Sequence, residues 1–243
     1  MASEKAVASI LNSSKFNSAK TEKIVLPLRL HSIGHMMRLK ELQLVYQIAR
    51  DYVQPGRHII DAGTFLGASA AAISAGLADR PDRELFYRKV HSYDSFINAN
   101  DFYARFLHGS VELGGSFLAH FLDNIRPYHE YVNVYPGDFL KSRWIDQPIG
   151  FFFNDISKSR ELDAHIWRHY TPHWLPGETI FVQQDFVHIQ APYVHVALGA
   201  VIDNFEPLAI VSPSIALRYA TALTPKQIES AIHLARVDAG PSY

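Results

Sequence analysis

The segment from His58 to Ser69, which reads HIIDAGTFLGAS, decides the fold. A short apolar run ends in an acid, Asp61, two glycines follow at positions 63 and 67, and small residues then begin a helical stretch. Glycines at such a turn let the backbone bend tightly and approach a ligand closely. The first turn of the helix offers N–H groups without intrahelical partners, and Ser69 can add a hydroxyl. The order predicts a strand, a ligand-binding turn and a helix, although two glycines are also typical of a turn that binds nothing.

Short apolar runs alternate with longer helical stretches beyond this segment. We expect strands at residues 58–61, 90–94, 131–135, 149–154, 179–184 and 208–212, the last forming an edge hairpin with residues 216–219. We expect helices at residues 67–78, 116–126, 160–169, 193–205 and 225–235. Repeated strand-then-helix order implies right-handed crossovers. The predicted fold class is therefore α/β, a Rossmann-like, doubly wound and mainly parallel sheet with an N-terminal helical extension.

The predicted domain boundary lies near residue 54. Residues 24–52 carry apolar residues at helical spacing, and Gln54-Pro55-Gly56 stops that pattern. We assign residues 1–54 to an N-terminal arm and helical cap, and residues 55–243 to a single domain, because no Pro-, Gly- or Ser-rich linker interrupts residues 55–235.

Composition excludes several function classes. The 23 Lys and Arg against 24 Asp and Glu give a net charge of −1, which argues against a nucleic-acid partner. The absence of Cys excludes disulfides, thiolate metal sites and a cysteine nucleophile. We find neither a signal-peptide pattern in the first residues nor an apolar run of membrane-spanning length. We therefore expect a cytoplasmic protein without a membrane partner.

Acids also follow the second and third predicted strands. Asp94 ends the second strand, where a carboxylate can accept hydrogen bonds from a ribose diol, although it could equally cap the next turn. Gly137 and Asp138 follow the third strand, where the acid could contact an adenine amino group or simply belong to an ordinary turn. Asp61 would repel a pyrophosphate but attract an ammonium. This favours S-adenosylmethionine over a dinucleotide.

The series resembles the class I S-adenosylmethionine-dependent methyltransferases. More narrowly, Asp61-x-Gly63-x-x-x-Gly67-x-Ser69 resembles the glycine loop of catechol-type and macrocin-type O-methyltransferases. The resemblance covers roughly residues 56–190. It implies that S-adenosylmethionine is bound by Asp61, Gly63, Thr64, Gly67, Ser69, Asp94, Gly137 and Asp138.

The fourth and fifth strands support the narrower resemblance. Residues 153–158, FNDISK, resemble a Phe-x-Asp-x-x-Lys segment in which the Asp binds Mg²⁺ and the Lys lies near the acceptor. Residues 176–186, PGETIFVQQDF, resemble the segment that supplies the other metal ligands. The implied ligands are Asp155, Gln184 and Asp185. Two acids and an amide carry less charge than three acids, so the resemblance leaves Mg²⁺ dependence open.

The implied activity is transfer of a methyl group to a hydroxyl of a small molecule or glycan, with a (deoxy)sugar as the first candidate. The candidate catalytic residues are Asp155, Lys158 and His188. Asp155 would act through a metal-bound hydroxyl, and Lys158 or His188 would take its proton. The N-terminal helix could pack on a second subunit or cover its own sheet, so a homo-oligomer is left open.

Two alternative functions, from other functional classes, remain open. A nicotinamide-dependent oxidoreductase would need a pyrophosphate-type glycine motif, but Thr64-Phe65-Leu66 lacks the required glycine. A non-catalytic binding protein on a methyltransferase scaffold is kept because of the departure at Gln184. The Asn-Pro-Pro motif of enzymes that methylate nucleic-acid amino groups is absent after the fourth strand, where residues 154–157 read NDIS.

Overall fold

Seven strands form the sheet of the computed structural model, which describes residues 24–187 and 191–237. The strands are β1 (His58–Ala62), β2 (Val90–Asp94), β3 (Val132–Pro136), β4 (Ile149–Asn154), β5 (Ile180–Gln183), β6 (Phe205–Val211) and β7 (Ser214–Tyr219). Their order is β3-β2-β1-β4-β5-β7-β6. This is the doubly wound order 3-2-1-4-5-6 with one strand inserted before the last. The inserted strand, β7, runs antiparallel to both neighbours. The predicted Rossmann-like, mainly parallel sheet is confirmed.

The helices between the strands divide between two compact units, which lie within residues 24–139 and 140–237. The α-helices are α2 (Leu39–Asp51), α3 (Ala68–Ala78), α4 (Asp101–Leu107), α5 (Leu118–Asn124), α6 (Arg160–His169), α7 (Pro192–Gly199) and α8 (Pro225–Arg236). Short 3₁₀ turns lie at Leu28–Ser32, Arg83–Phe86, Arg126–Tyr128, Phe139–Lys141, Thr171–His173 and Ile202–Asn204.

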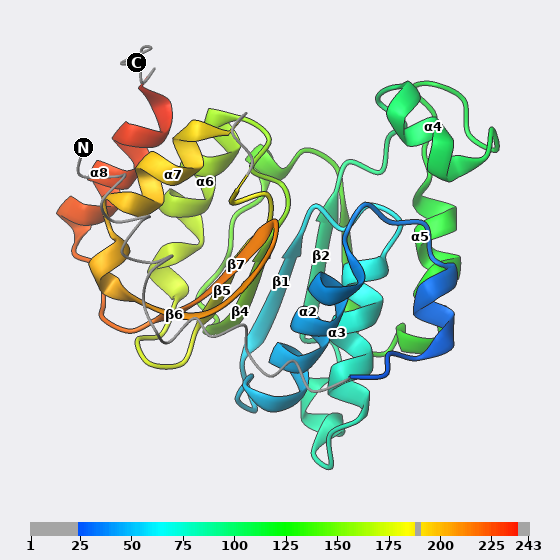
Figure 1. Cartoon of the computed structure of the whole chain (residues 1–243), viewed down its shortest axis with the longest axis horizontal. Helices are drawn as coiled ribbons and strands as arrows, with labels where there is room; N and C mark the ends of the chain where they lie inside the picture. Colours follow the sequence, from blue (N-terminus) through cyan, green and yellow to red (C-terminus); the bar gives the residue numbers. More distant parts are fainter. Residues whose placement is uncertain (1–23, 188–190, 238–243) are drawn as a thin grey trace. The chain divides into compact units, whose positions relative to one another are not determined.

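In the unit of residues 24–139, β1 pairs in parallel with β2, and β2 with β3. Helices α2 and α3 lie side by side (Figure 1). Helix α3 consists of small and apolar residues and is almost entirely buried. Its Gly76 lets α2 approach closely, because a Cβ at this position would lie 2.3 Å from the Tyr46 carbonyl oxygen. The unit is therefore held by close contact between backbones as well as by apolar side chains.

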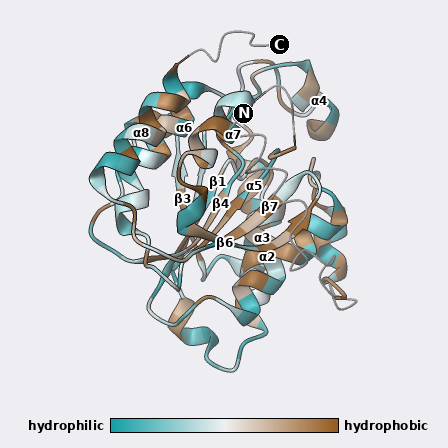
Figure 2. Cartoon of the chain, turned by 60° about the vertical axis from the view of Figure 1, so that its left-hand side comes forward, coloured by the Kyte–Doolittle hydropathy of each residue, from teal (hydrophilic) through white to brown (hydrophobic). Residues whose placement is uncertain are grey.

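In the unit of residues 140–237, β4 and β5 are parallel neighbours, and β7 and β6 add an antiparallel pair. All six residues of β4 are buried, as a strand covered on both faces requires. Helix α8 packs against both α6 and α7 (Figure 1). Figure 2 shows how hydrophobic residues follow the strands, whereas α8 turns hydrophilic residues outward.

The largest differences from the predicted boundaries are at three places. The helical pattern of residues 24–52 becomes a helix only from Leu39, because the preceding segment contains Pro27 and Gly34. The helix predicted at residues 193–205 ends at Gly199, and strand β6 begins at Phe205 rather than at residue 208. Helix α4 was not predicted. Residues 1–23 and His188 lie outside the described residues.

None of the helices within the described ranges combines the length and the apolar character that a bilayer span requires.

Candidate functional site

Asp61 lies at the end of β1 in the unit of residues 24–139 and is fully buried. Asp61 Oδ2 accepts a hydrogen bond from the Ser92 hydroxyl at 3.2 Å. Asp61 Oδ1 has no hydrogen-bond partner among the described residues. Burial raises the pKa of Asp61 to about 6, and nearby hydroxyl groups oppose this effect. An unpartnered buried carboxylate oxygen costs free energy unless a ligand donates to it. Asp61 therefore has the properties of a ligand-binding residue.

The glycine turn places backbone N–H groups beside this acid. Gly63 and Gly67 have φ values of +91° and +93°, which favour glycine. The first hydrogen bond within α3 runs from Ala71 N–H to Gly67 O, at 2.8 Å. The N–H groups of residues 68–70 therefore precede the intrahelical ladder and face the region before the helix. Ser69 and Thr64 are both buried here, and the Thr64 hydroxyl has no hydrogen-bond partner among the described residues.

Asp94 joins this turn to the end of β2. Its Oδ2 accepts a hydrogen bond from Phe65 N–H at 3.0 Å, and its Oδ1 accepts one from Phe96 N–H at 2.8 Å. Burial raises its pKa, and these two backbone donors oppose the effect. The Ser95 hydroxyl also donates to Oδ1, at 3.5 Å. A carboxylate has about four acceptor sites, so about one remains after these three bonds. Asp94 can therefore still accept a hydrogen bond from a hydroxyl of a diol, as the sequence predicts.

The turn after β3 reaches the same edge of the sheet. Gly137 N–H donates to Asp94 O at 2.9 Å, and Gly137 has a φ of +128°. Asp138 follows it on the exposed surface. The structure thus brings Asp61, the glycine turn, Asp94 and Gly137 together within one unit, while the role of Asp138 stays a prediction.

Phe65 is a residue of this turn that the sequence analysis did not single out. It adopts a left-handed backbone conformation with φ of 48°, which non-glycine residues rarely do. Its ring packs against Tyr103 and Phe106 of α4 and against Phe117, with centroid distances of 5.1–5.7 Å. The glycine turn is therefore connected to α4 by aromatic packing. The only sequence signal was an aromatic residue between two glycines.

The predicted residues that follow β4 and β5 form a second cluster, in the unit of residues 140–237. The Lys158 ammonium lies 2.6 Å from Asp155 Oδ1, 2.7 Å from Asp185 Oδ2 and 3.3 Å from Gln184 Oε1. We call these four residues the Lys158 cluster. Partial desolvation of this half-exposed side chain lowers the pKa of Lys158, but Asp155 and Asp185 outweigh that effect and raise the pKa overall. Lys158 is therefore an ammonium at neutral pH.

A buried polar network supports this cluster and was not predicted. Asn154 Nδ2 donates to Ser157 Oγ at 2.8 Å and to Gln183 Oε1 at 2.7 Å. Ser157 Oγ donates to Asp163 Oδ1 at 3.1 Å, and Trp167 Nε1 donates to Asp163 Oδ2 at 3.1 Å. Burial raises the pKa of Asp163 to about 7, against the hydrogen bonds from Ser157 and Trp167. The available sequence signal was an acid and a Trp four residues apart. Both lie on the buried face of α6.

The Lys158 cluster does not fit the Mg²⁺ ion that the resemblance implies. The two carboxylates and the amide oxygen already surround an ammonium, so a divalent cation would have to displace it. Nor do three His, Asp or Glu side chains gather into a metal-binding group anywhere in residues 24–187 and 191–237. We therefore derive no step through a metal ion.

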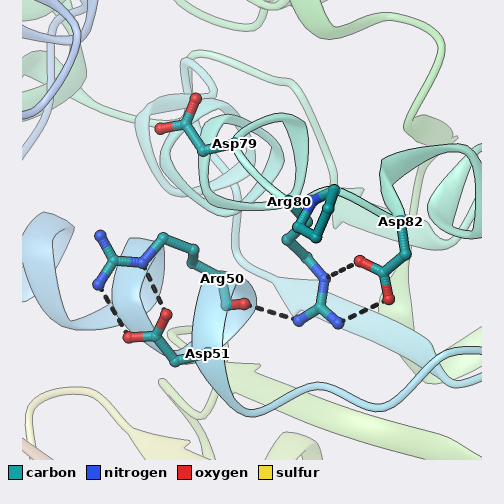
Figure 3. Close-up of a pocket in the computed structure, with 6 residues that line it drawn as sticks. Arg50, Asp51, Asp79, Arg80 and Asp82 are labelled. Atoms are coloured by element: carbon teal, nitrogen blue, oxygen red, sulfur yellow. Dashed lines mark hydrogen bonds and ion pairs between the residues drawn. The ribbon is translucent and has the colours of Figure 1, made fainter.

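A surface hollow in the unit of residues 24–139 lies at the opposite end of α3 from the glycine turn. It is lined by Arg50, Asp51, Asp79, Arg80, Pro81 and Asp82. Figure 3 shows that its charges are satisfied locally: Arg50 pairs with Asp51, and Arg80 pairs with Asp82 and donates to the Arg50 carbonyl. Asp79 accepts from the Tyr46 hydroxyl. Ion pairs therefore join four of the five charged groups of the hollow, and Asp79 is held by the Tyr46 hydroxyl.

Comparison with known proteins identifies the fold. No family model and no curated protein matches the chain. Among solved structures, the O-methyltransferase NovP is 17% identical, covers 76% of this chain and 82% of its own, and has a TM-score of 0.56. CalS11, a TDP-rhamnose 3′-O-methyltransferase of calicheamicin biosynthesis, is 16% identical over 90% of this chain and 93% of its own, with a TM-score of 0.53. A putative O-methyltransferase from Klebsiella pneumoniae is 13% identical, covers 84% of this chain and 94% of its own, and has a TM-score of 0.51. The chain therefore has the class I O-methyltransferase fold.

Proposed function

We propose that the protein is an O-methyltransferase that takes its methyl group from S-adenosylmethionine. The observation that carries the proposal is the unpartnered buried oxygen of Asp61, beside the glycine turn and the N-terminus of α3, in a fold shared with NovP and CalS11. S-adenosylmethionine supplies a methyl group made electrophilic by a sulfonium, and its amino-acid end carries an ammonium and a carboxylate. The residues around Asp61 match both charges.

Each residue of the donor site has a distinct task in this proposal. Asp61 accepts from the ammonium, because an ionised carboxylate forms strong hydrogen bonds to cationic donors. The N–H groups at the start of α3 face the carboxylate, which the helix dipole also favours. Asp94 accepts from a ribose hydroxyl through its remaining acceptor site. Gly137 and Asp138 are proposed to border the adenine.

The methyl acceptor is proposed to be a hydroxyl of a small molecule or glycan, with a (deoxy)sugar as first choice. The support for a sugar is that CalS11, which shares the fold over most of both chains, acts on TDP-rhamnose. In the reaction the carbon–sulfur bond breaks, a carbon–oxygen bond forms in line with it, and the hydroxyl proton passes to a base. His188 and Lys158 stay predictions for that base, and Lys158 would first have to leave its two carboxylates.

The first test is calorimetric titration of the full chain with S-adenosylhomocysteine. We expect saturable binding of one molecule per chain, strongly weakened in Asp61→Asn and unchanged in Glu130→Gln, which removes an exposed acid of the same unit. No binding to the folded protein would refute the donor site. Titration with nicotinamide cofactors would then test the alternative oxidoreductase hypothesis.

The second test identifies the acceptor. The protein is incubated with S-adenosylmethionine and a panel of nucleotide-linked sugars and deoxysugars, and products are detected by their mass increase of one methylene. Donor binding without turnover on any hydroxyl compound would favour a non-catalytic binding protein on this scaffold.

A further inference from the structure

The Lys158 cluster holds its own cation. We propose that the Lys158 ammonium is the resident cation of this cluster, in the place that a divalent metal ion would take, and that the protein works without such an ion. The part of this inference that concerns catalysis rests on the proposed methyl transfer, while the part that concerns cation binding does not.

The Lys158 ammonium has one acceptor oxygen for each of its N–H donors. A lysine ammonium has three N–H donors and no acceptor. Asp155, Asp185 and Gln184 provide three acceptor oxygens within 2.6, 2.7 and 3.3 Å of Nζ. These are the three residues that the sequence resemblance assigned as metal ligands. The oxygens that should converge on a metal ion therefore converge on the nitrogen of Lys158.

The backbone builds this arrangement into the fold. Asp155 and Lys158 follow β4, while Gln184 and Asp185 follow its parallel neighbour β5, with Asn154 and Gln183 as the last paired residues. Asp185 adopts a left-handed conformation with φ of 58°, which costs free energy in a non-glycine residue. The ends of the two strands therefore place both carboxylates around the same atom, Lys158 Nζ.

Hydrogen bonds to buried side chains anchor the loop between Asp155 and Lys158. Tyr193 OH donates to the Ser157 carbonyl oxygen at 2.9 Å, and the Ser157 hydroxyl donates to Asp163 at 3.1 Å. Both partners are buried. This anchoring fixes the residue that precedes Lys158, so the lysine is directed toward its acceptors by buried contacts and not only by its own charge.

The charges oppose joint occupation of the cluster by the ammonium and a divalent ion. Two carboxylates and one ammonium sum to −1, and a divalent ion beside the ammonium would meet a like charge at close range. Removing the ammonium would instead leave two carboxylates and an amide oxygen, which are ligands for hard cations. Because the Lys158 side chain is 55% exposed, ions from solution can reach the cluster, and the proposal can be tested directly.

The experiment titrates Mn²⁺ into the metal-free full chain and follows free Mn²⁺ by electron paramagnetic resonance. We expect no saturable site in the wild-type protein at millimolar Mn²⁺. In Lys158→Ala we expect one site per chain, at least about tenfold tighter than any wild-type binding. The double variant Lys158→Ala/Asp185→Asn should lose that site. Lys226→Ala, which removes an exposed lysine of the same unit, should behave as wild type.

Two results would overturn the proposal. One is a single Mn²⁺ site in the wild-type protein that Asp185→Asn abolishes, because Lys158 would then yield its place to the metal ion. The other is a folded Lys158→Ala variant, shown by its thermal unfolding, that binds no Mn²⁺, because the three oxygens would then not form a cation site.

Methyl transfer provides a separate readout. With S-adenosylmethionine and an accepted hydroxyl compound, we expect the same rate with a chelator and with added Mg²⁺. A rate that the chelator abolishes and Mg²⁺ restores would contradict the proposal. Failure of the protein to bind S-adenosylhomocysteine would refute the methyltransferase function but would leave the Mn²⁺ titration fully interpretable.

Discussion

In the proposed donor site, we expect Asp61 to couple donor binding to pH, because its buried carboxylate must be ionised to hold an ammonium. Burial raises its pKa to about 6, so the carboxylate is charged at pH 7.5 and largely protonated at pH 5. We expect the affinity for S-adenosylhomocysteine to fall as the pH drops through 6. Asp61→Asn should weaken binding about ten- to hundredfold at pH 7.5, the range expected for a lost charge-assisted hydrogen bond, and should flatten the pH dependence. Calorimetry at pH 5, 6 and 7.5 measures both effects, and a pH dependence that persists in Asp61→Asn would contradict this assignment.

We expect Asp163 to affect the stability of the fold, because its carboxyl group is buried. Its folded-state pKa of about 7 lies above the ordinary aspartate value, so the folded protein binds the proton more tightly than the unfolded chain. Stability should therefore fall as the pH rises from about 4 to 7, and the loss should be complete above 7. Asp163→Asn remains neutral and can still accept from Trp167. We expect this variant to be more stable than wild type at pH 8, by up to a few kcal/mol, with a smaller difference at pH 5. Urea unfolding at both pH values measures this, and a difference independent of pH would count against it.

At the scale of elements, the turn from β1 into α3 depends on Gly67. Its φ is +93°, and a Cβ would lie 2.9 Å from Ile125 Cγ2 and 3.0 Å from Phe121 Cδ2. Gly56 also has a positive φ, +80°, but a Cβ there would meet nothing within 4 Å. Gly56→Ala should therefore cost only backbone strain, about 1 kcal/mol, whereas Gly67→Ala should cost about 2–4 kcal/mol and weaken donor binding. Thermal unfolding compares the two variants. Equal losses would show that packing around α5 does not constrain this turn.

The elements that the sequence predicted well are those whose burial is uniform or strongly periodic. Strand β4 is buried along its length and apolar up to Phe153, and α6 and α8 begin at capping residues, Ser159 and Thr224. The end of α7 was misplaced because apolar residues continue past Gly199 into the 3₁₀ turn and β6. Helix α4 was missed because it is only seven residues long and its one buried residue is Leu107. Short helices that are fixed by tertiary aromatic contacts leave little periodicity to read.

At the scale of the whole molecule, sequence order was enough to group the candidate site residues but not to give their partners. Acids at the ends of parallel strands are expected to gather at one edge, and Asp61 and Asp94 do so within their unit, as Asp155 and Asp185 do within theirs. That Lys158 would be surrounded by the predicted metal ligands could not be read from spacing, since it depends on side-chain direction. The buried Asp163 network was missed for the same reason.

Donor binding should also leave a spatial pattern along the chain. All proposed donor contacts lie within residues 61–138, whereas the Lys158 cluster lies within residues 155–185. A ligand at 100 times its dissociation constant stabilises the bound state by about 2.7 kcal/mol, which slows exchange through local opening about a hundredfold. We therefore expect S-adenosylhomocysteine to slow hydrogen exchange most at residues 62–70, 94–97 and 137–138, and to lose this effect in Asp61→Asn. Hydrogen-exchange mass spectrometry resolves these segments. Protection confined to residues 140–237 would show that the donor binds elsewhere, because no residue there belongs to the proposed donor site.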